Sequence, residues 1–204
     1  MSPAVEAILA AYKERAAQEA QRIAAGEQIP LDDQLLTVGP VVGGLLNGLA
    51  KGIGAKTILE LGTSYGGSTV WLAEAAQATG GRVISIDIAA DKQAYARDML
   101  RKANLEASVQ FLTGDAVKEI RKWDGAFDFI LVDLWKDLYV PCLEAFYPKL
   151  AAGALIVADN CTYPPDAIVT VGKYRAAVRA MPHIESILLP IGNGIELSRF
   201  TKTF

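Results

Sequence analysis

The sequence is poor in the residue types that carry thiol and imidazole chemistry, because its 204 residues include one histidine and two cysteines. Cys142 and Cys161 are too few for a disulfide framework and lack metal-type spacing, so we interpret both as free thiols. His183 lies far in sequence from the acidic clusters, and we expect a structural or surface histidine. Ser64 and Ser68 have no histidine partner in register, so a serine nucleophile is not predicted.

Long apolar runs and an excess of positive charge are also missing. No apolar stretch approaches the roughly 20 residues that span a bilayer, and charged residues interrupt the N-terminal segment. We therefore expect no signal peptide, no membrane anchor and a cytoplasmic location. The chain has 20 Lys and Arg against 23 Asp and Glu, a formal net charge of -3. This balance argues against nucleic acid as a partner, because phosphate backbones attract a positive surface.

Hydrophobic residues make up 51% of the chain, and their pattern predicts an α/β fold. From Lys56 onward, short strand-like runs alternate with longer amphipathic segments, as expected for βαβ units. The strand-like runs are TILELG, VISIDI, VQFL, FDFILVDL and ALIVAD, and the helical segments between them are residues 68–78, 91–103, 117–123 and 139–150. Parallel strands need such crossovers, so we expect a Rossmann-like, doubly wound sheet with helices on both faces.

The two ends of the chain depart from this alternation. Ser2-Pro3 predicts the start of an amphipathic helix that reaches Gly26. A loop then leads to a glycine-rich apolar segment, residues 35–53, which we expect to be loosely helical. At the other end, a predicted helix over 167–181 precedes the runs IESILLP and IELSRF, which a turn sequence separates. We expect these two runs to form a hairpin, so that a seven-stranded, mostly parallel sheet ends in an antiparallel strand.

A glycine-containing loop follows the first predicted strand, in the sequence ELGTSYGGS that starts at Glu60. In α/β sheets the backbone approaches ligands at this place. The first two glycines are four residues apart, so the loop lacks the G-x-G-x-x-G spacing of a pyrophosphate cradle and a nicotinamide cofactor is disfavoured. Asp87 ends the second strand, where a carboxylate accepts ribose hydroxyls, and Asp115 follows the third. Each feature alone is common in α/β folds, but together they predict a site for a nucleoside without phosphates.

Oxygen-bearing side chains gather at the predicted ends of the fourth and fifth strands. Asp133 ends the fourth strand, in the segment DLWKD, and Asp159 and Asn160 end the fifth. Adjacent strands would place the three side chains around one point at the carboxyl edge of the sheet. Two carboxylates and an amide oxygen suit a hard divalent cation, Mg best and Mn or Ca as alternatives. The competing interpretation is that strand-end aspartates cap the helices that follow.

In these motifs the sequence resembles the class I S-adenosylmethionine-dependent O-methyltransferases of the catechol and caffeoyl-coenzyme A type, from about Leu36 to the C-terminus. The segments VDLWKDLY and LIVADN are similar to animal catechol O-methyltransferase, and LLPIGNGIELSR is similar to the hairpin of caffeoyl-coenzyme A and bacterial members. The resemblance implies methyl transfer to a hydroxyl of a small catechol-like aromatic. A phenol is mostly neutral at pH 7, so a metal that binds and acidifies the hydroxyl and a general base are both expected.

The resemblance implies that Lys136 is the general base and that Asp133, Asp159 and Asn160 bind the metal. The residues expected at the cofactor, from the pattern and the resemblance together, are Val38, Glu60, Gly62, Ser64, Gly66, Ser68, Asp87, Ile88, Asp115, Ala116 and Asp133. The residues expected at the substrate are Leu36, Trp135, Lys136 and Asn160. We expect one methyltransferase domain over residues 1–204, with 1–54 as N-terminal helices and substrate lid and 55–204 as the cofactor-binding core.

The sequence departs from the catechol enzyme at three positions. Leu134 stands where that enzyme has a histidine beside the adenine, Gln34 where it has a tryptophan wall, and Leu189 where it has an acidic residue that bonds the second catechol hydroxyl. The identity of the acceptor therefore stays open. Two further hypotheses are a metal-independent methyltransferase acting on another acceptor and a non-catalytic module that binds S-adenosylmethionine. The resemblance leaves a monomer and a homodimer both open.

Overall fold

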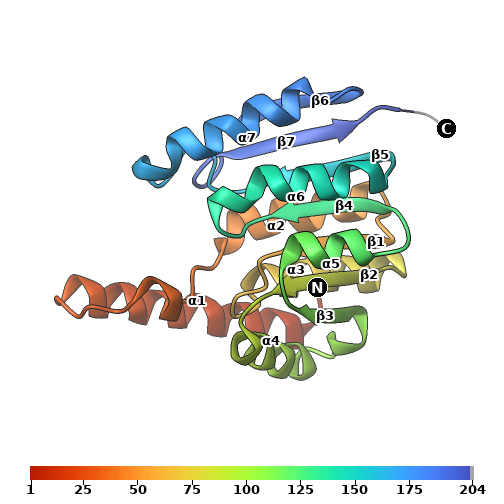
Figure 1. The fold of residues 1–204 in the computed structure, drawn as a ribbon. Helices are drawn as coiled ribbons and strands as arrows, with labels where there is room; N and C mark the ends of the chain where they lie inside the picture. Colours follow the sequence, from red (N-terminus) through yellow and green to blue (C-terminus); the bar gives the residue numbers. More distant parts are fainter. Residues whose placement is uncertain (203–204) are drawn as a thin grey trace.

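The computed structural model describes residues 1–202, which form a seven-stranded sheet between two layers of helices (Figure 1). The strands are β1 (Thr57–Leu61), β2 (Arg82–Asp87), β3 (Val109–Thr113), β4 (Phe127–Val132), β5 (Leu150–Ala158), β6 (Ile184–Leu189) and β7 (Ile195–Phe200). The helices are α1 (Pro3–Ala24), α2 (Gly39–Gly52), α3 (Gly67–Thr79), α4 (Ala90–Lys102), α5 (Ala116–Lys122), α6 (Tyr139–Phe146) and α7 (Ile168–Ala180). Within these residues, no helix is both long enough and apolar enough to cross a membrane.

The strands follow the order β3-β2-β1-β4-β5-β7-β6 across the sheet. Neighbours from β3 to β5 pair in parallel, whereas β7 is antiparallel to both β5 and β6. The prediction of a doubly wound sheet with an antiparallel last strand is confirmed. Because parallel strands end at the same edge, the loops that follow β1, β2, β4 and β5 lie together at the carboxyl edge of the sheet.

The central strands bury both of their faces, as their continuous apolar runs predict. In β1, Ile58 packs on the side covered by α1 to α4, together with Phe129 and Leu131 of β4. The next residue, Leu59, packs on the side covered by α5 to α7, together with Ile130. Alternation along each strand thus divides the core into two layers and fixes the register of the carboxyl edge.

One predicted helix is too long. The segment 139–150 was expected to be helical throughout, but α6 ends at Phe146, Tyr147–Lys149 form a 3-10 turn, and β5 begins at Leu150. Pro148 explains the difference, because it lacks the backbone N–H that an α-helix requires and its ring crowds the preceding turn.

The glycine-rich segment expected to be loosely helical contains α2, a regular helix of 14 residues. Val42, Leu46 and Ala50 are buried at four-residue intervals, so packing of this stripe outweighs the low helix propensity of glycine. Gly43 lies against α3, where an added Cβ would stand 2.2 Å from Nε1 of Trp71. This glycine is therefore required by the close approach of two helices.

Replacing Gly43 with alanine is expected to lower the free energy of unfolding by about 1–3 kcal/mol, because the new methyl group overlaps the Trp71 indole. Gly48 is the matched control in the same helix, since a Cβ added there would meet nothing within 4 Å. Gly48→Ala should raise the free energy of unfolding by about 0.5–1 kcal/mol. Urea unfolding of both variants measures the difference, and effects of the same sign would contradict this account of α2.

Candidate functional site

The loop after β1 contacts the loop after β4 through Gly62. Its φ of 102° lies in the left-handed region, and an added Cβ would stand 2.0 Å from the carbonyl oxygen of Asp133. The backbone N–H of Asp133 in turn donates to the carbonyl of Leu61, at 2.9 Å. The predicted cofactor loop and the predicted metal loop are therefore in direct contact, and glycine is the residue that permits it.

Asp87 joins the ends of β1 and β2. Its Oδ2 accepts the backbone N–H of Ser64 at 2.7 Å, and its Oδ1 accepts the N–H of Ala89 at 2.9 Å. Ser64 has a φ of 46°, and its hydroxyl is buried without a hydrogen-bond partner among residues 1–202. A buried polar atom without a partner is uncommon in folded proteins, and a bound ligand would satisfy it.

Glu60 lies in a fully buried polar network beneath this loop. Its carboxylate accepts hydrogen bonds from Ser68 and Thr69 of α3, both at 2.7 Å, and from Ser85 of β2 at 2.5 Å. Burial raises the pKa of Glu60 to about 7, although these three hydrogen bonds oppose the shift. With every oxygen engaged inside the protein, Glu60 is suited to holding the start of α3 in place.

The acidic residues predicted to bind metal do come together. Asp133 and Asp159 follow paired residues of adjacent strands, because Val132 of β4 is in register with Ala158 of β5. Burial raises the pKa of Asp159 to about 7, with a second contribution from the charge of Asp133. Burial likewise raises the pKa of Asp133, and the nearby Lys136 opposes that shift. Two carboxylates in this setting favour a cation between them.

Asn160 supplies the third oxygen of this group. It has a φ of 55°, and its backbone N–H donates to Oδ1 of Asp159 at 2.7 Å. The turn between β6 and β7 braces the residues that follow, since Cys161 and Thr162 donate to the carbonyls of Gly194 and Asn193 at 2.8 and 2.9 Å. The hairpin therefore holds the loop that carries Asp159 and Asn160.

Lys136 points into the acidic cluster. Its Nζ donates to Oδ1 of Asn160 at 2.9 Å and lies 3.5 Å from Oδ1 of Asp133. A cation thus already lies among the oxygens that the sequence predicts to hold a metal. Within residues 1–202, no group of three His, Cys, Asp or Glu side chains has the arrangement of a metal site, so the amide of Asn160 is needed to complete a set of three.

Tyr139 belongs to this site, and sequence reasoning missed it. Its hydroxyl accepts a hydrogen bond from Nζ of Lys136 at 2.6 Å and donates to the backbone carbonyl of Asp159 at 2.9 Å. The side chain is fully buried at the start of α6. The spacing K-x-x-Y could have predicted this contact, because residues three apart in a helical turn lie on the same face.

The remaining predicted residues lie around the same edge in different settings. Asp115 is exposed and caps α5 by accepting the N–H of Lys118 at 3.0 Å, whereas its neighbour Ala116 is buried. Ile88, Trp135 and Leu36 are large apolar side chains left at least half exposed, at 70%, 50% and 54%. Apolar side chains exposed in this way are free to contact a ligand. Val38 is partly buried at the start of α2, and Gly66 has a φ of 88° in the loop before α3.

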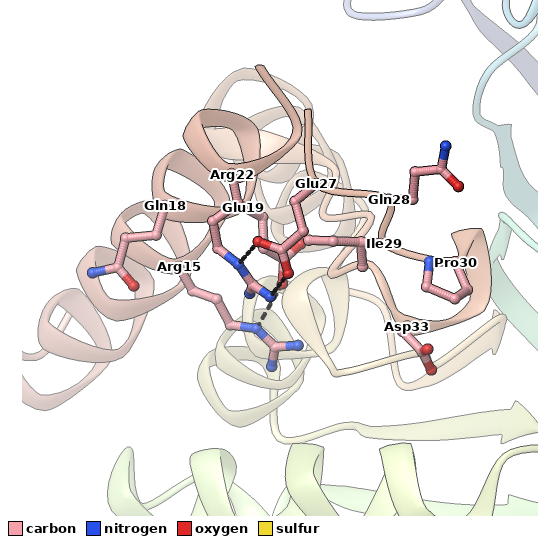
Figure 2. Close-up of a pocket in the computed structure, with 9 residues that line it drawn as sticks. All are labelled: Arg15, Gln18, Glu19, Arg22, Glu27, Gln28, Ile29, Pro30 and Asp33. Carbon is pink, nitrogen blue, oxygen red and sulfur yellow. Dashed lines mark hydrogen bonds and ion pairs between the residues drawn. The ribbon is translucent and has the colours of Figure 1, made fainter. Parts of the chain in front are cut away.

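One hollow is separate from these residues. A cavity of about 400 Å³ lies between the second half of α1 and the segment that follows it (Figure 2). Arg15 and Arg22 line it, but they are already paired with Glu19 and Glu27. Both cations are therefore paired within the protein, and none of the lining residues is among those predicted to bind cofactor, metal or substrate.

Known proteins similar to this chain are methyltransferases. Residues 59–161 match the family of methyltransferase domains. A caffeoyl-CoA O-methyltransferase from Nicotiana tabacum is 31% identical over 186 residues, covering 81% of this chain and 77% of that protein. A catechol O-methyltransferase from Niastella koreensis is 36% identical over 129 residues, covering 61% of this chain and 58% of that protein.

Solved structures share the fold. An O-methyltransferase from Bacillus cereus in complex with SAH aligns with a TM-score of 0.75 at 23% identity, covering 98% of this chain and 92% of the other. The O-methyltransferase TomG from Streptomyces achromogenes, in complex with SAM, aligns with a TM-score of 0.76 at 24% identity, covering 99% and 91%. The fold of Figure 1 is thus shared with these solved structures.

Proposed function

We propose, from the fact that this chain belongs to the S-adenosylmethionine-dependent O-methyltransferases, that it methylates a hydroxyl of a small aromatic with vicinal hydroxyls, assisted by a divalent metal. The observation that carries the proposal is the convergence of Asp133, Asp159, Asn160 and Lys136 beside the loop after β1. We assign one methyltransferase domain to residues 1–204, in which 1–54 form the N-terminal helices and substrate lid and 55–204 the cofactor-binding core.

The residues at the ends of β1 and β2 fit the cofactor. The hydroxyl of Ser64 is buried without a partner among residues 1–202, and S-adenosylmethionine offers amino and carboxylate groups to satisfy it. Asp87 holds the loop with one bond per oxygen, which leaves each oxygen able to accept a ribose hydroxyl. Ile88 and Ala116 would contact the adenine. Glu60 would act through Ser68, because its carboxylate is enclosed.

The residues at the ends of β4 and β5 fit a divalent metal. Asp133, Asp159 and Asn160 offer carboxylate and amide oxygens, which are the ligands that Mg, Mn and Ca prefer. Burial and the charge of Asp133 raise the pKa of Asp159, so a positive charge bound beside the pair would favour its ionised form. A metal bound there would supply charge that fixes the accepting hydroxyl and lowers its pKa.

The chain's own part in the reaction is to align the acceptor and to take its proton. S-adenosylmethionine supplies a methyl group that is already activated, so an oxygen nucleophile must be held in line behind it. Lys136 would accept the hydroxyl proton in its neutral form, and the resulting ammonium is held by Tyr139 and Asn160. Leu36 and Trp135, both exposed, would cover the faces of the aromatic ring.

A metal-independent methyltransferase is the second candidate, because one observation favours it. The Lys136 ammonium is 2.9 Å from Oδ1 of Asn160 and 3.5 Å from Oδ1 of Asp133, so the acidic pair has a cation without any metal. In that case the aspartates would hold the substrate directly. Removal of metal separates the two candidates.

The first experiment follows methyl transfer from labelled S-adenosylmethionine to caffeate, protocatechuate and dihydroxyphenylalanine, with Mg or with excess chelator. 4-Coumarate is the matched control for caffeate, because it lacks the second hydroxyl and cannot chelate. Product from caffeate with Mg alone, and none from 4-coumarate, is the expected result. Product that survives the chelator would select the metal-independent candidate. Cofactor binding without transfer to any acceptor would move the chain to a non-catalytic role.

A further inference from the structure

The helix α1 consists of two halves with different surroundings. Val5, Ile8 and Tyr12 are buried against the core, whereas the second half is largely exposed and projects away from the sheet (Figure 1). Tyr12, Arg15 and Glu19 follow one another at steps of three and four residues, so they lie on one face of the helix. Tyr12 and Arg15 contact the loop after β1, and Glu19 contacts the segment before α2.

Tyr12 reaches the middle of the cofactor loop. Its hydroxyl donates to the backbone carbonyl of Tyr65 at 2.5 Å. The tyrosine is 3% exposed, and burial raises the pKa of its hydroxyl well above the usual value, so the group stays a donor. The next residue, Gly66, is enclosed as well, since an added Cβ would stand 2.6 Å from Cβ of Ala96 and 3.2 Å from the Tyr12 hydroxyl.

The side chain of Tyr65 is held from two helices. The guanidinium carbon of Arg15 lies 4.2 Å from the centre of the Tyr65 ring, and Nζ of Lys92 from α4 lies 5.3 Å from it. Tyr95, also from α4, packs edge-on at 5.5 Å between ring centres. Cation–π and edge-to-face contacts of this kind are each stabilising. Both the backbone and the ring of Tyr65 are thus fixed by α1.

Glu19 connects the same face of α1 to the segment before α2. One carboxylate oxygen pairs with Nε of Arg15 at 3.0 Å, as Figure 2 shows, and the other accepts the backbone N–H of Leu35 at 2.8 Å. Two residues further on, Thr37 packs against the cofactor loop, because a Cβ at Gly67 would stand 2.4 Å from its hydroxyl. The segment 35–38 and the loop 62–67 therefore contact each other, and α1 holds both.

Both held segments contain backbone conformations that are costly for ordinary side chains. Leu36 has a φ of 44° and Ser64 a φ of 46°. Such conformations are strained for residues other than glycine and persist where the surrounding structure fixes them. The Tyr12, Arg15 and Glu19 contacts supply that constraint from outside the cofactor loop.

We propose that Tyr12 and Glu19 are positioning residues for S-adenosylmethionine, which hold the loop 62–67 and the segment 35–38 in the shape that binds it. The inference rests on the proposed cofactor site at this loop. Neither residue touches the reacting atoms. Loss of either one lowers the fraction of molecules in the binding-competent shape, and the apparent dissociation constant rises by the same factor. Once the cofactor is bound, the loops are ordered and the rate of methyl transfer is restored.

The test compares Tyr12→Phe, Glu19→Gln and Glu19→Ala with the wild-type protein. Tyr12→Phe keeps the ring and removes the hydrogen bond, so the dissociation constant for S-adenosylmethionine should rise about tenfold. Glu19→Gln keeps an acceptor for Leu35 and loses the ion pair, so its effect should be smaller than that of Glu19→Ala. Calorimetry measures affinity, and steady-state kinetics should show a raised KM with kcat changed less than about twofold.

Hydrogen exchange of the loop amides distinguishes a positioning role from a general effect on stability. In Tyr12→Phe and Glu19→Ala, the amides of 62–67 and 35–38 should exchange faster without cofactor and return to the wild-type rate with saturating cofactor. Glu14→Ala is the matched control, because Glu14 is an exposed carboxylate on the same helix whose partner is Gln18. This variant should bind the cofactor as the wild type does.

Each outcome decides between the two proposals. Wild-type affinity in both Tyr12→Phe and Glu19→Ala would overturn the positioning role, and so would a fall in kcat without a change in KM. Asp87→Ala tests the underlying site independently. If Asp87→Ala weakens binding while the α1 variants do not, the cofactor site stands and the positioning role fails. If Asp87→Ala binds normally, or the wild type does not bind the cofactor, both proposals fail.

Discussion

Replacing Lys136 with alanine is expected to lower kcat for methyl transfer by about 100- to 10,000-fold, the usual contribution of a general base. Nζ of Lys136 lies 2.9 Å from Oδ1 of Asn160 and 2.6 Å from the hydroxyl of Tyr139, so the amine is held at the metal-binding edge of the proposed site. KM for S-adenosylmethionine should change less than about threefold, because Lys136 is not among the residues proposed to bind the cofactor. Steady-state kinetics at saturating Mg measures both constants.

Acceptors of different acidity test whether Lys136 acts as a general base or only stabilises the fold. A catechol with an electron-withdrawing group is already largely ionised, so the defect of Lys136→Ala should shrink for that acceptor. Asp137→Ala, which changes an exposed neighbour, is the control and should retain wild-type kcat. An equal defect for acidic and less acidic acceptors would contradict proton transfer to Lys136.

Stability is expected to fall as pH rises from about 4.5 to 7, and Glu60→Gln should remove part of that fall. Burial raises the pKa of Glu60 from 4.5 to about 7, so the folded state keeps a proton that the unfolded state releases. The stabilisation is fully present below pH 4.5 and is lost as pH rises through 7. At 1.36 kcal/mol for each pKa unit, the loss amounts to about 3 kcal/mol.

Urea unfolding of the metal-free protein between pH 4.5 and 8 measures this effect. The difference in free energy of unfolding between wild type and Glu60→Gln should change by about 2–3 kcal/mol across the range. Asp159, whose pKa is also raised to about 7, contributes with the same sign, so the double variant Glu60→Gln/Asp159→Asn should be flatter still. Parallel curves for wild type and Glu60→Gln would contradict the raised pKa of Glu60.

The parts of the fold that local pattern encodes could be predicted from the sequence. Strands β1, β2, β4 and β5 are largely apolar runs. Asp133 follows β4, and Asp159 and Asn160 follow β5, so their meeting at one edge follows from parallel pairing. The position of β7 between β5 and β6 is a matter of long-range packing and has no local signal. The helical pattern of α2 was hidden for a similar reason, because Gly43 serves contact with Trp71.

The residues of the candidate site likewise differ in whether the local sequence predicts them. Charged residues at strand ends can be recognised from the sequence as candidate site residues. Tyr139 and Tyr12 cannot, because in the sequence they resemble ordinary core aromatics. Tyr139 bonds Lys136 across one helical turn, and Tyr12 bonds Tyr65 across 53 positions of sequence. The place of Glu60 in the loop motif predicts cofactor contact, and the sequence gives no sign that Ser68, Thr69 and Ser85 donate hydrogen bonds to its carboxylate.

The brace between the β6–β7 turn and the loop after β5 has a consequence for the order of events during synthesis. Cys161 and Thr162 depend on the carbonyls of Gly194 and Asn193, and β5 pairs with β7. Chains emerge from the ribosome N-terminus first, so β1 to β4 and the cofactor loop are available well before residue 195. The loop that carries Asp159 and Asn160 therefore gains its brace last, and a chain halted before β7 would lack the hydrogen bonds that hold this loop.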